Sequence, residues 1–362
     1  MSTLKESLFT SSDESDEQEQ HDPAFEGAPP EEPRRRSVWK LLGLILLVLA
    51  VLVAGCVGAV GWWVHENLQT IDKNIERFPD PSASLPDSER PEVVVPEAQN
   101  YLLLGSDSRI SAGDPSQWTF GAQRTDAIMI LHIPADRSAA YVMSIPRDSW
   151  VPIPGRKGKY KINAAFSYGG PTLMVQTVEK LTGVRLDHVV IADFEGFKDI
   201  TDRLGGVDIT IAGEGTKHMD GDEALVYVRT RKTLANGDFD RVKRQQNWIR
   251  TVLAKLMSKD TVKSPTTLMD SLKMLSKSVA TDDGLSNGEM RDLEWSMKTL
   301  RDHDVTFMTV PVSGTGWSPD HKQSIVKLDP DADAPLFEAV RKDTMVDYLD
   351  TYGGNVLGSK VN

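Results

Sequence analysis

An uncharged apolar run over residues 41–64 divides this chain of 362 residues and limits what its first part can fold into. The run has 24 residues, and as a helix it would be roughly 36 Å long, which is enough to span a bilayer. Trp39 lies at one end and Trp62-Trp63 at the other, as is typical of membrane–water interfaces. Arg34-Arg35-Arg36 and Lys40 precede the run, so we expect the N-terminus in the cytoplasm and the remainder outside.

A bacterial lipoprotein signal is the alternative interpretation of this run. Val53-Ala54-Gly55-Cys56 resembles a lipoprotein cleavage site, which would leave Cys56 lipidated. The apolar run continues to Val64 and the segment before Arg34 is long, and both features argue against this alternative. Either interpretation places the rest of the chain at the outer face of a membrane. Cys56 is the one cysteine, which excludes an internal disulfide and a cysteine-based zinc site.

The composition of the flanking segments predicts the remaining domain boundaries. Residues 1–40 form an acidic tail with a basic end, and its residues 1–33 hold ten acids and one lysine, which is −9 of the formal charge of −12. Few apolar residues accompany these charges, so we expect disorder there. Five prolines in polar surroundings predict an extracytoplasmic stalk over residues 65–98. The folded domain then covers residues 99–345, and residues 346–362 form a C-terminal tail.

Within the folded domain, predicted strands and helices alternate. The predicted strands are 100–104, 127–133, 139–145, 188–192, 207–211 and 305–312. The predicted helices are 171–183, 195–204, 241–258 and 290–302. This alternation predicts an α/β fold, a three-layer α/β/α sandwich in which helices cover both faces of one mixed central sheet.

A basic segment, Tyr227–Arg250, interrupts the acidic chain with seven Lys/Arg residues against two acids. Asn236-Gly237 predicts a turn, and Asp238 or Asp240 then caps the helix that follows. On that helix, the apolar residues from Val242 to Leu256 recur at helical spacing and predict one buried face.

A second face of the same helix carries polar groups suited to an anion. Arg241, Gln245 and Trp248 share this face, with Arg244 beside them. Several guanidinium groups near a helix start suit a multiply charged oxyanion such as a pyrophosphate. A solvated basic helix face is the alternative interpretation.

Acidic and basic residues also flank three of the predicted strands. Asp107 follows the first strand, Arg124 and Asp126 precede the second on one side of it, and Arg147 follows the third. Two carboxylates that converge at strand ends beside arginines can hold a divalent cation together with a phosphate. Each acid alone could instead be a turn residue. The chain has no HExxH, P-loop or dinucleotide-binding motif, which argues against the corresponding enzyme classes.

Four motifs in order resemble the LytR–CpsA–Psr family. They are NYLLLGSDSR (100–109), RTDAIM (124–129), SIPRDS (144–149) with KINAAF (161–166), and YVRTRK…GDFDRVKRQQ (227–246). The resemblance implies an extracytoplasmic phosphotransferase of the bacterial envelope with an α/β/α sandwich and an apolar tunnel for a polyprenyl chain. Such enzymes move a glycan phosphate from a polyprenyl-pyrophosphate carrier to a cell-wall acceptor, typically a peptidoglycan sugar hydroxyl.

The resemblance also implies roles for individual residues. Arg124 and Arg147 would bind the pyrophosphate, whereas Asp107 and Asp126 would hold Mg²⁺. The implied catalytic residues are Arg124, Asp126, Arg147, Arg229, Arg241 and Gln245, with Arg231 and Arg244 as further substrate-binding residues. Asp126 would also be able to accept the proton of the acceptor hydroxyl. Asp240 stands where many members have a small residue.

The implied partners are a polyprenyl-pyrophosphate-linked glycan, a peptidoglycan acceptor and the membrane, with no nucleic acid. Two alternatives remain, which are a hydrolase with the same pocket and a non-catalytic lipid- or glycan-binding module. The pair Asp107 and Asp126 argues against the binding module, because a binder needs no metal-holding carboxylates. Met174, Val175, Val178 and Leu181 either face a lipid tunnel or form ordinary core.

Overall fold

The computed structural model describes residues 62–106, 125–230, 234 and 237–361. Nearly all of the predicted membrane span at 41–64, and all of the acidic tail, therefore lie outside the described residues. A helix covers residues 62–74. Within the described ranges, no helix has both the length and the apolar character needed to cross a membrane.

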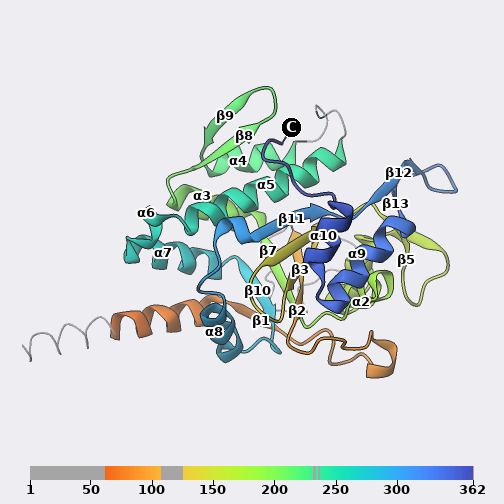
Figure 1. The fold of residues 1–362 in the computed structure, drawn as a ribbon, viewed down its shortest axis with the longest axis horizontal. Coiled ribbons are helices and arrows are strands. Elements are labelled where there is room, and N and C mark those ends of the chain that lie inside the picture. Colours follow the sequence, from red (N-terminus) through yellow and green to blue (C-terminus); the bar gives the residue numbers. More distant parts are fainter. Residues whose placement is uncertain (1–61, 107–124, 231–233, 235–236, 362) are drawn as a thin grey trace, which may run out of the picture. The chain divides into compact units, whose positions relative to one another are not determined.

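A seven-stranded mixed sheet forms the centre of the fold (Figure 1). In spatial order its strands are β1 (Glu76–Phe78), β10 (Val279–Asp282), β7 (His188–Asp193), β2 (Gln99–Ser106), β3 (Thr125–Ile133), β4 (Ala140–Ser144) and β11 (Val305–Thr309). β2 is antiparallel to β3 and parallel to β7, and β4 is antiparallel to β3 and parallel to β11. The predicted mixed sheet is thus confirmed.

Helices cover both faces of this sheet. α2 (Ala164–Thr182), α9 (Pro330–Lys342) and α10 (Met345–Tyr352) lie on one face, where Ile128 and Ile130 of β3 point. α3 (Phe194–Arg203), α4 (Gly221–Arg229) and α5 (Asp238–Leu256) lie on the other face (Figure 1). Ala127 and Met129 of β3 pack in the core on that face. Because side chains alternate along β3, its apolar run supplies two separate cores. The structure therefore confirms the predicted three-layer sandwich.

Smaller elements surround these layers. Three hairpins are β5 (Trp150–Pro152) with β6 (Lys159–Lys161), β8 (Val207–Ile211) with β9 (Gly215–Met219), and β12 (Val312–Trp317) with β13 (Ser324–Leu328). The remaining helices are α6 (Lys259–Val262), α7 (Pro265–Ser276), α8 (Asn287–Ser296), and the single 3-10 turns η1 (Asp87–Glu89) and η3 (Asp302–Asp304).

The folded unit extends beyond both ends of the segment predicted as the domain. Before Gln99, β1 pairs in parallel with β10, and Arg90 forms an ion pair of 2.7 Å with the buried carboxylate of Glu179. After residue 345, the backbone N–H of Leu357 donates to the carbonyl of Phe307 at 2.7 Å. Parts of the segments predicted as stalk and tail therefore pack on the sheet, because they satisfy backbone groups at its edges.

α2 bends at two glycines. Gly170 has φ 61° and ψ −155°, a conformation that favours glycine, and Pro171 begins the straight second part of the helix. That second part matches the predicted helix 171–183. Its Met174, Val175 and Val178 are buried in the core against the sheet, and Leu181 is partly buried against the same core. The first three thus belong to the core of this structure.

Candidate functional site

The site lies where the start of β3, the segment after β4 and the start of α5 meet. β3 and β4 are antiparallel neighbours, with Met129 opposite Ser144, so the start of one strand lies beside the end of the other. Asp126 is the second residue of β3, and Arg147 follows β4 by three residues. Arg241 lies in the first turn of α5. The structure therefore brings three of the predicted site residues together at one end of these neighbouring strands.

Arg147 is the centre of this cluster. Its Nη1 forms an ion pair with Oδ1 of Asp126. Its Nε lies 3.9 Å from Oδ1 of Asp148 and 4.0 Å from Oδ1 of Asp238. Asp148 also forms an ion pair of 3.0 Å with Lys161 on β6. One guanidinium thus contacts three carboxylates, and all four side chains are largely buried, which strengthens their mutual attraction.

Arg241 extends the cluster into α5. Its Nη2 lies 2.5 Å from Oδ1 of Asp238, although the angles do not make a hydrogen bond. The residue is only 6% exposed, and its Nε has no hydrogen-bond partner within the described ranges. A buried charged donor without a partner costs roughly 1–3 kcal/mol or more. An oxyanion ligand would supply the missing acceptor.

Gln245 lies one turn further along the same face of α5. It is 4% exposed, and its Oε1 has no hydrogen-bond partner in the part of the chain that the structure describes. A flip of the amide would present an N–H at the same place. Gln245 therefore has a polar group available on the same face as Arg241.

The start of α5 differs from the predicted cap. Gly237, with φ 55°, is the N-cap residue, and neither Asp238 nor Asp240 caps the helix. A left-handed backbone at this position favours glycine over aspartate. Asp238 does not cap the helix, and its carboxylate forms an ion pair with Arg241. Asp240 is buried, with 1% of its surface exposed. The prediction of an aspartate cap was wrong.

Two buried side chains hold α5 in place. Nε2 of Gln246, which is fully buried, donates to Ser144 Oγ at 2.7 Å and to the Met308 carbonyl at 2.6 Å. Nε1 of Trp248 donates to Thr201 Oγ1 at 3.0 Å within the core between α3 and α5. The prediction that Trp248 belongs to the anion-binding face was therefore wrong, because both faces of α5 are covered.

Sequence reasoning missed the role of Gln246, although a signal was present. Gln246 is four residues after Val242 and three before Ile249, so it lies on the predicted apolar face of α5. A polar residue on an apolar helix face needs a buried hydrogen-bond partner. Here the partners are the ends of β4 and β11, which places α5 over the edge of the sheet where Arg147 lies.

The other predicted residues are placed as follows. Arg229 is the last residue of α4 and is exposed. The guanidinium of Arg244 lies 4.4 Å from the ring centroid of Tyr227, and its Nη1 donates to the Tyr227 carbonyl at 3.2 Å. These contacts join α5 to α4. Asp107, Arg124 and Arg231 lie outside the described residues.

The cluster has the donors that a divalent cation prefers, although the arrangement in this structure is an ion-pair network. Asp126, Asp148 and Asp238 supply carboxylate oxygens, which suit a hard cation such as Mg²⁺. Within the described ranges, no three His, Cys, Asp or Glu residues are grouped in a way that would hold a metal ion. The predicted partner of Asp126 in metal binding, Asp107, is outside those ranges.

Comparison with known proteins identifies relatives. Residues 72–329 match the model of the LytR_cpsA_psr family. The probable cell wall biosynthesis protein LcpB of Corynebacterium glutamicum is 40% identical over 200 residues, covering 50% of this chain and 47% of that protein. A polyisoprenyl-teichoic acid–peptidoglycan teichoic acid transferase, TagU of Bacillus mycoides, is 30% identical over 272 residues, covering 72% and 84%.

Among solved structures, TagT is similar in fold and sequence. B. subtilis TagT has a TM-score of 0.53 at 25% identity, over 75% of this chain and 99% of that chain. A structure of TagT bound to LI-WTA has the same TM-score and identity, over 71% and 97%. The match to LcpB covers only about half the length of that relative, whereas the match to TagU covers most of it.

Proposed function

The chain belongs to the LytR_cpsA_psr family, and from this premise we propose that it is a membrane-anchored, extracytoplasmic glycan phosphotransferase. A glycan phosphate passes from a polyprenyl-pyrophosphate carrier to a hydroxyl of peptidoglycan, and polyprenyl phosphate leaves. The name of TagU, a teichoic acid transferase between polyisoprenyl-teichoic acid and peptidoglycan, supports this reaction. TagT, which is similar to this chain in fold and sequence, has a solved structure with LI-WTA bound, and this supports a related ligand here.

The observation that carries the proposal is the buried cluster around Arg147 and Arg241. Phosphoryl transfer requires neutralisation of charge on the transferred group and an aligned nucleophile, and little covalent work by the protein. A buried guanidinium binds two phosphate oxygens with a fixed geometry. The buried Nε–H group of Arg241 has no acceptor within the described ranges, and a bound oxyanion would supply one.

In the proposed reaction, the arginines bind the pyrophosphate and one carboxylate accepts the proton. Arg147 and Arg241 bind the non-bridging oxygens of the pyrophosphate, joined by Arg124 and Arg229. The acceptor hydroxyl oxygen forms a bond to the phosphorus next to the sugar, and the bond from that phosphorus to the bridging oxygen breaks. Asp126 accepts the hydroxyl proton, and the negative charge leaves on polyprenyl phosphate.

Asp126 and Asp107 are also the residues that would hold Mg²⁺. Carboxylate oxygens fit this ion, and Asp126 lies at the strand end next to the arginines. When bound, Mg²⁺ neutralises charge on the pyrophosphate and its leaving oxygen. Because Asp126 pairs with Arg147 in this structure, metal binding at Asp126 would free that guanidinium for the phosphate.

Membrane anchoring completes the proposal. The apolar run at 41–64 and the basic cluster before it predict a single span with the cytoplasmic tail inside. A polyprenyl carrier lies in the same bilayer, so an anchor holds the enzyme next to its substrate and raises the effective concentration of the pair.

The test is release of polyprenyl phosphate by the full-length protein in detergent, given a polyprenyl-pyrophosphate sugar and Mg²⁺, with and without peptidoglycan fragments. We expect release that increases with acceptor and falls by about 10²–10³-fold in Arg147→Ala. Arg203→Ala, which removes an exposed arginine paired with Asp270, is the matched control and should retain release. Release that ignores the acceptor would indicate a hydrolase, and retained lipid without release would indicate a binding module.

A further inference from the structure

The helix at residues 62–74 limits how far the folded unit can stand from a bilayer. The predicted span ends at Val64, and Asp72 follows eight residues later on the same helix. At a rise of 1.5 Å per residue, Asp72 lies at most about 12 Å beyond the end of that span, and any tilt of the helix brings it closer to the bilayer. The polar layer on each side of a bilayer is roughly 5–8 Å thick. Groups that contact Asp72 are therefore close to the lipid headgroups.

α8 is one of the elements attached to this helix. Nη2 of Arg291 on α8 forms an ion pair of 3.4 Å with Oδ2 of Asp72. At the end of the helix, Nδ2 of Asn74 donates to Oγ of Ser276 on α7 at 3.2 Å. Figure 1 shows the helix beside α8, as the ion pair requires. The height of α8 above the bilayer is thus set by the helix that continues the predicted span.

The outer face of α8 carries an exposed tryptophan. The face of this segment that packs on the core is already supplied with apolar side chains, which are Met290, Leu293 and Met297. Trp295 is 72% exposed, and Nζ of Lys298 lies 3.9 Å from the centroid of its ring. Arg291, Trp295 and Lys298 follow one another at helical spacing. This face therefore presents an indole ring between two cations, one turn or less from the contact with Asp72.

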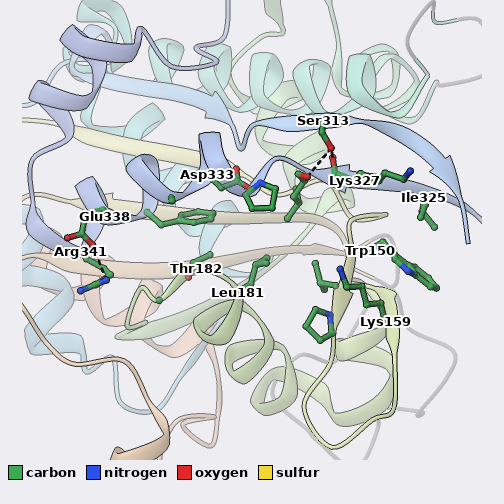
Figure 2. Close-up of a pocket in the computed structure, with 17 residues that line it drawn as sticks. Trp150, Lys159, Leu181, Thr182, Ser313, Ile325, Lys327, Asp333, Glu338 and Arg341 are labelled. Carbon is green, nitrogen blue, oxygen red and sulfur yellow. Dashed lines mark hydrogen bonds and ion pairs between the residues drawn. The ribbon is translucent and has the colours of Figure 1, made fainter.

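Two other tryptophans have a place inside the folded unit. Trp248 is fully buried in the core between α3 and α5. Trp150 lines a cavity of about 710 Å³ together with residues of α2, α9 and the β12–β13 hairpin (Figure 2). A single exposed apolar side chain such as Trp295 needs no explanation on most surfaces. Here its position gives it one, because it lies next to the helix that leaves the predicted span.

The chemistry of this face matches the headgroup layer of a bilayer. An indole ring has a large apolar surface and one N–H donor, and tryptophan is enriched where membrane and water meet. A lysine beside the ring attracts lipid phosphate, and each Lys or Arg near an anionic surface contributes about 1 kcal/mol to binding. The same groups in water would leave the indole exposed without a partner.

We propose that α8 docks on the outer surface of the bilayer, with the ring of Trp295 in the headgroup layer and Lys298 at a lipid phosphate. The inference rests on the membrane anchoring that is part of the proposed function. The span alone would let the folded unit swing about one attachment point. A second contact at α8 fixes its orientation, so that the cluster around Arg147 keeps a constant position relative to the bilayer.

The experiment is fluorescence quenching of the full-length protein in nanodiscs of anionic lipid, with one protein in each disc and a nitroxide on the lipid headgroups. Cys56→Ser removes the native thiol, and a fluorophore is attached at one new cysteine. The three positions are Ser296→Cys on α8, His65→Cys just after the predicted span, and Thr315→Cys on β12, all of them exposed. Thr315 is the matched control, because it lies near the exposed Trp317 and well away from α8 in Figure 1.

We expect quenching at His65→Cys and at Ser296→Cys, and none at Thr315→Cys. Adding Trp295→Ala to the Ser296 reporter should reduce its quenching and leave that of the His65 reporter unchanged. Adding Lys298→Ala should weaken the contact about fivefold in anionic discs, and less in discs of zwitterionic lipid.

The His65 reporter separates this inference from the anchoring on which it rests. Quenching at His65→Cys without quenching at Ser296→Cys would refute the docking of α8 and leave the anchoring intact. Quenching at Ser296→Cys that neither Trp295→Ala nor Lys298→Ala changes would show mere proximity and would also overturn the proposal. No quenching at either position would refute the anchoring itself, and the docking with it.

Discussion

Replacing Asp333 by asparagine removes a buried titratable group from α9 while keeping its shape. Asp333 is only 5% exposed, and its Oδ1 has no hydrogen-bond partner within the described ranges. Burial raises the pKa of its carboxyl to about 7 in the folded chain, against 3.8 for an ordinary aspartate. Between these two values, the folded chain holds a proton that the unfolded chain has released. The free energy of unfolding therefore falls as the pH rises from about 4 to about 7, because ionisation then favours the unfolded chain.

The magnitude follows from the difference between the two pKa values. A gap from 3.8 to about 7 corresponds to about 4 kcal/mol, at about 1.4 kcal/mol for each unit. Asparagine does not titrate, so the stability of Asp333→Asn relative to the wild type should rise by that amount between pH 4 and pH 8. For a folded unit of this size, the corresponding change in the difference of melting temperatures is roughly 10 °C.

The assay is thermal unfolding of both full-length proteins in the same detergent at several pH values. Subtracting the two curves cancels the other titrating groups. Asp331→Asn, which changes an exposed aspartate on the same helix, is the control for loss of charge alone. A difference between Asp333→Asn and wild type that is the same at pH 4 and pH 8 would refute the raised pKa and the argument that this carboxyl is buried without a partner.

Two further predictions concern α5. Arg241→Lys keeps the charge but loses the planar set of N–H donors of the guanidinium. We expect polyprenyl phosphate release to fall about 10²-fold while the melting temperature changes little. Release equal to that of the wild type would show that Arg241 is not part of the site. Gln246→Ala leaves the Met308 carbonyl and the Ser144 hydroxyl without their donor, so the free energy of unfolding should fall by about 2–4 kcal/mol in chemical denaturation. A free energy of unfolding equal to that of the wild type would contradict the role of Gln246 in holding α5 in place.

The sequence was sufficient to predict the centre of the fold. The apolar runs that form β2, β3 and β4 are long and flanked by turn residues. The local pattern therefore predicts that they are strands and that both of their faces are buried. The meeting of Asp126 with Arg147 follows from the same reasoning, because both lie at strand ends. β1 is different, since its three residues pair with β10 about 200 residues later and no local pattern encodes that contact.

Helix α5 shows why some site residues were harder to predict. The apolar spacing predicts one buried face on this helix, and Trp248 falls on the other face, with Arg241 and Gln245. In the structure that residue is buried instead, because Trp248 packs on Phe197 of α3, a neighbouring helix of the same layer. Gly237 is the cap, because its φ of 55° is a backbone conformation that favours glycine over aspartate. Tertiary contacts decided the place of Trp248, and spacing along the chain does not contain them.

The balance of charge around Arg147 bears on how the site would select its ligand. Arg147, Arg241 and Lys161 face Asp126, Asp148 and Asp238, so the described cluster is close to neutral and attracts anions only weakly over a distance. The site must then select its ligand at short range, where the ligand replaces ion pairs within the cluster. A pyrophosphate offers the buried Arg241 N–H an acceptor that Asp238 does not supply, and a cation at Asp126 would release Arg147. Phosphate and metal would therefore bind more tightly together than either binds alone, because each removes an ion pair that opposes the other.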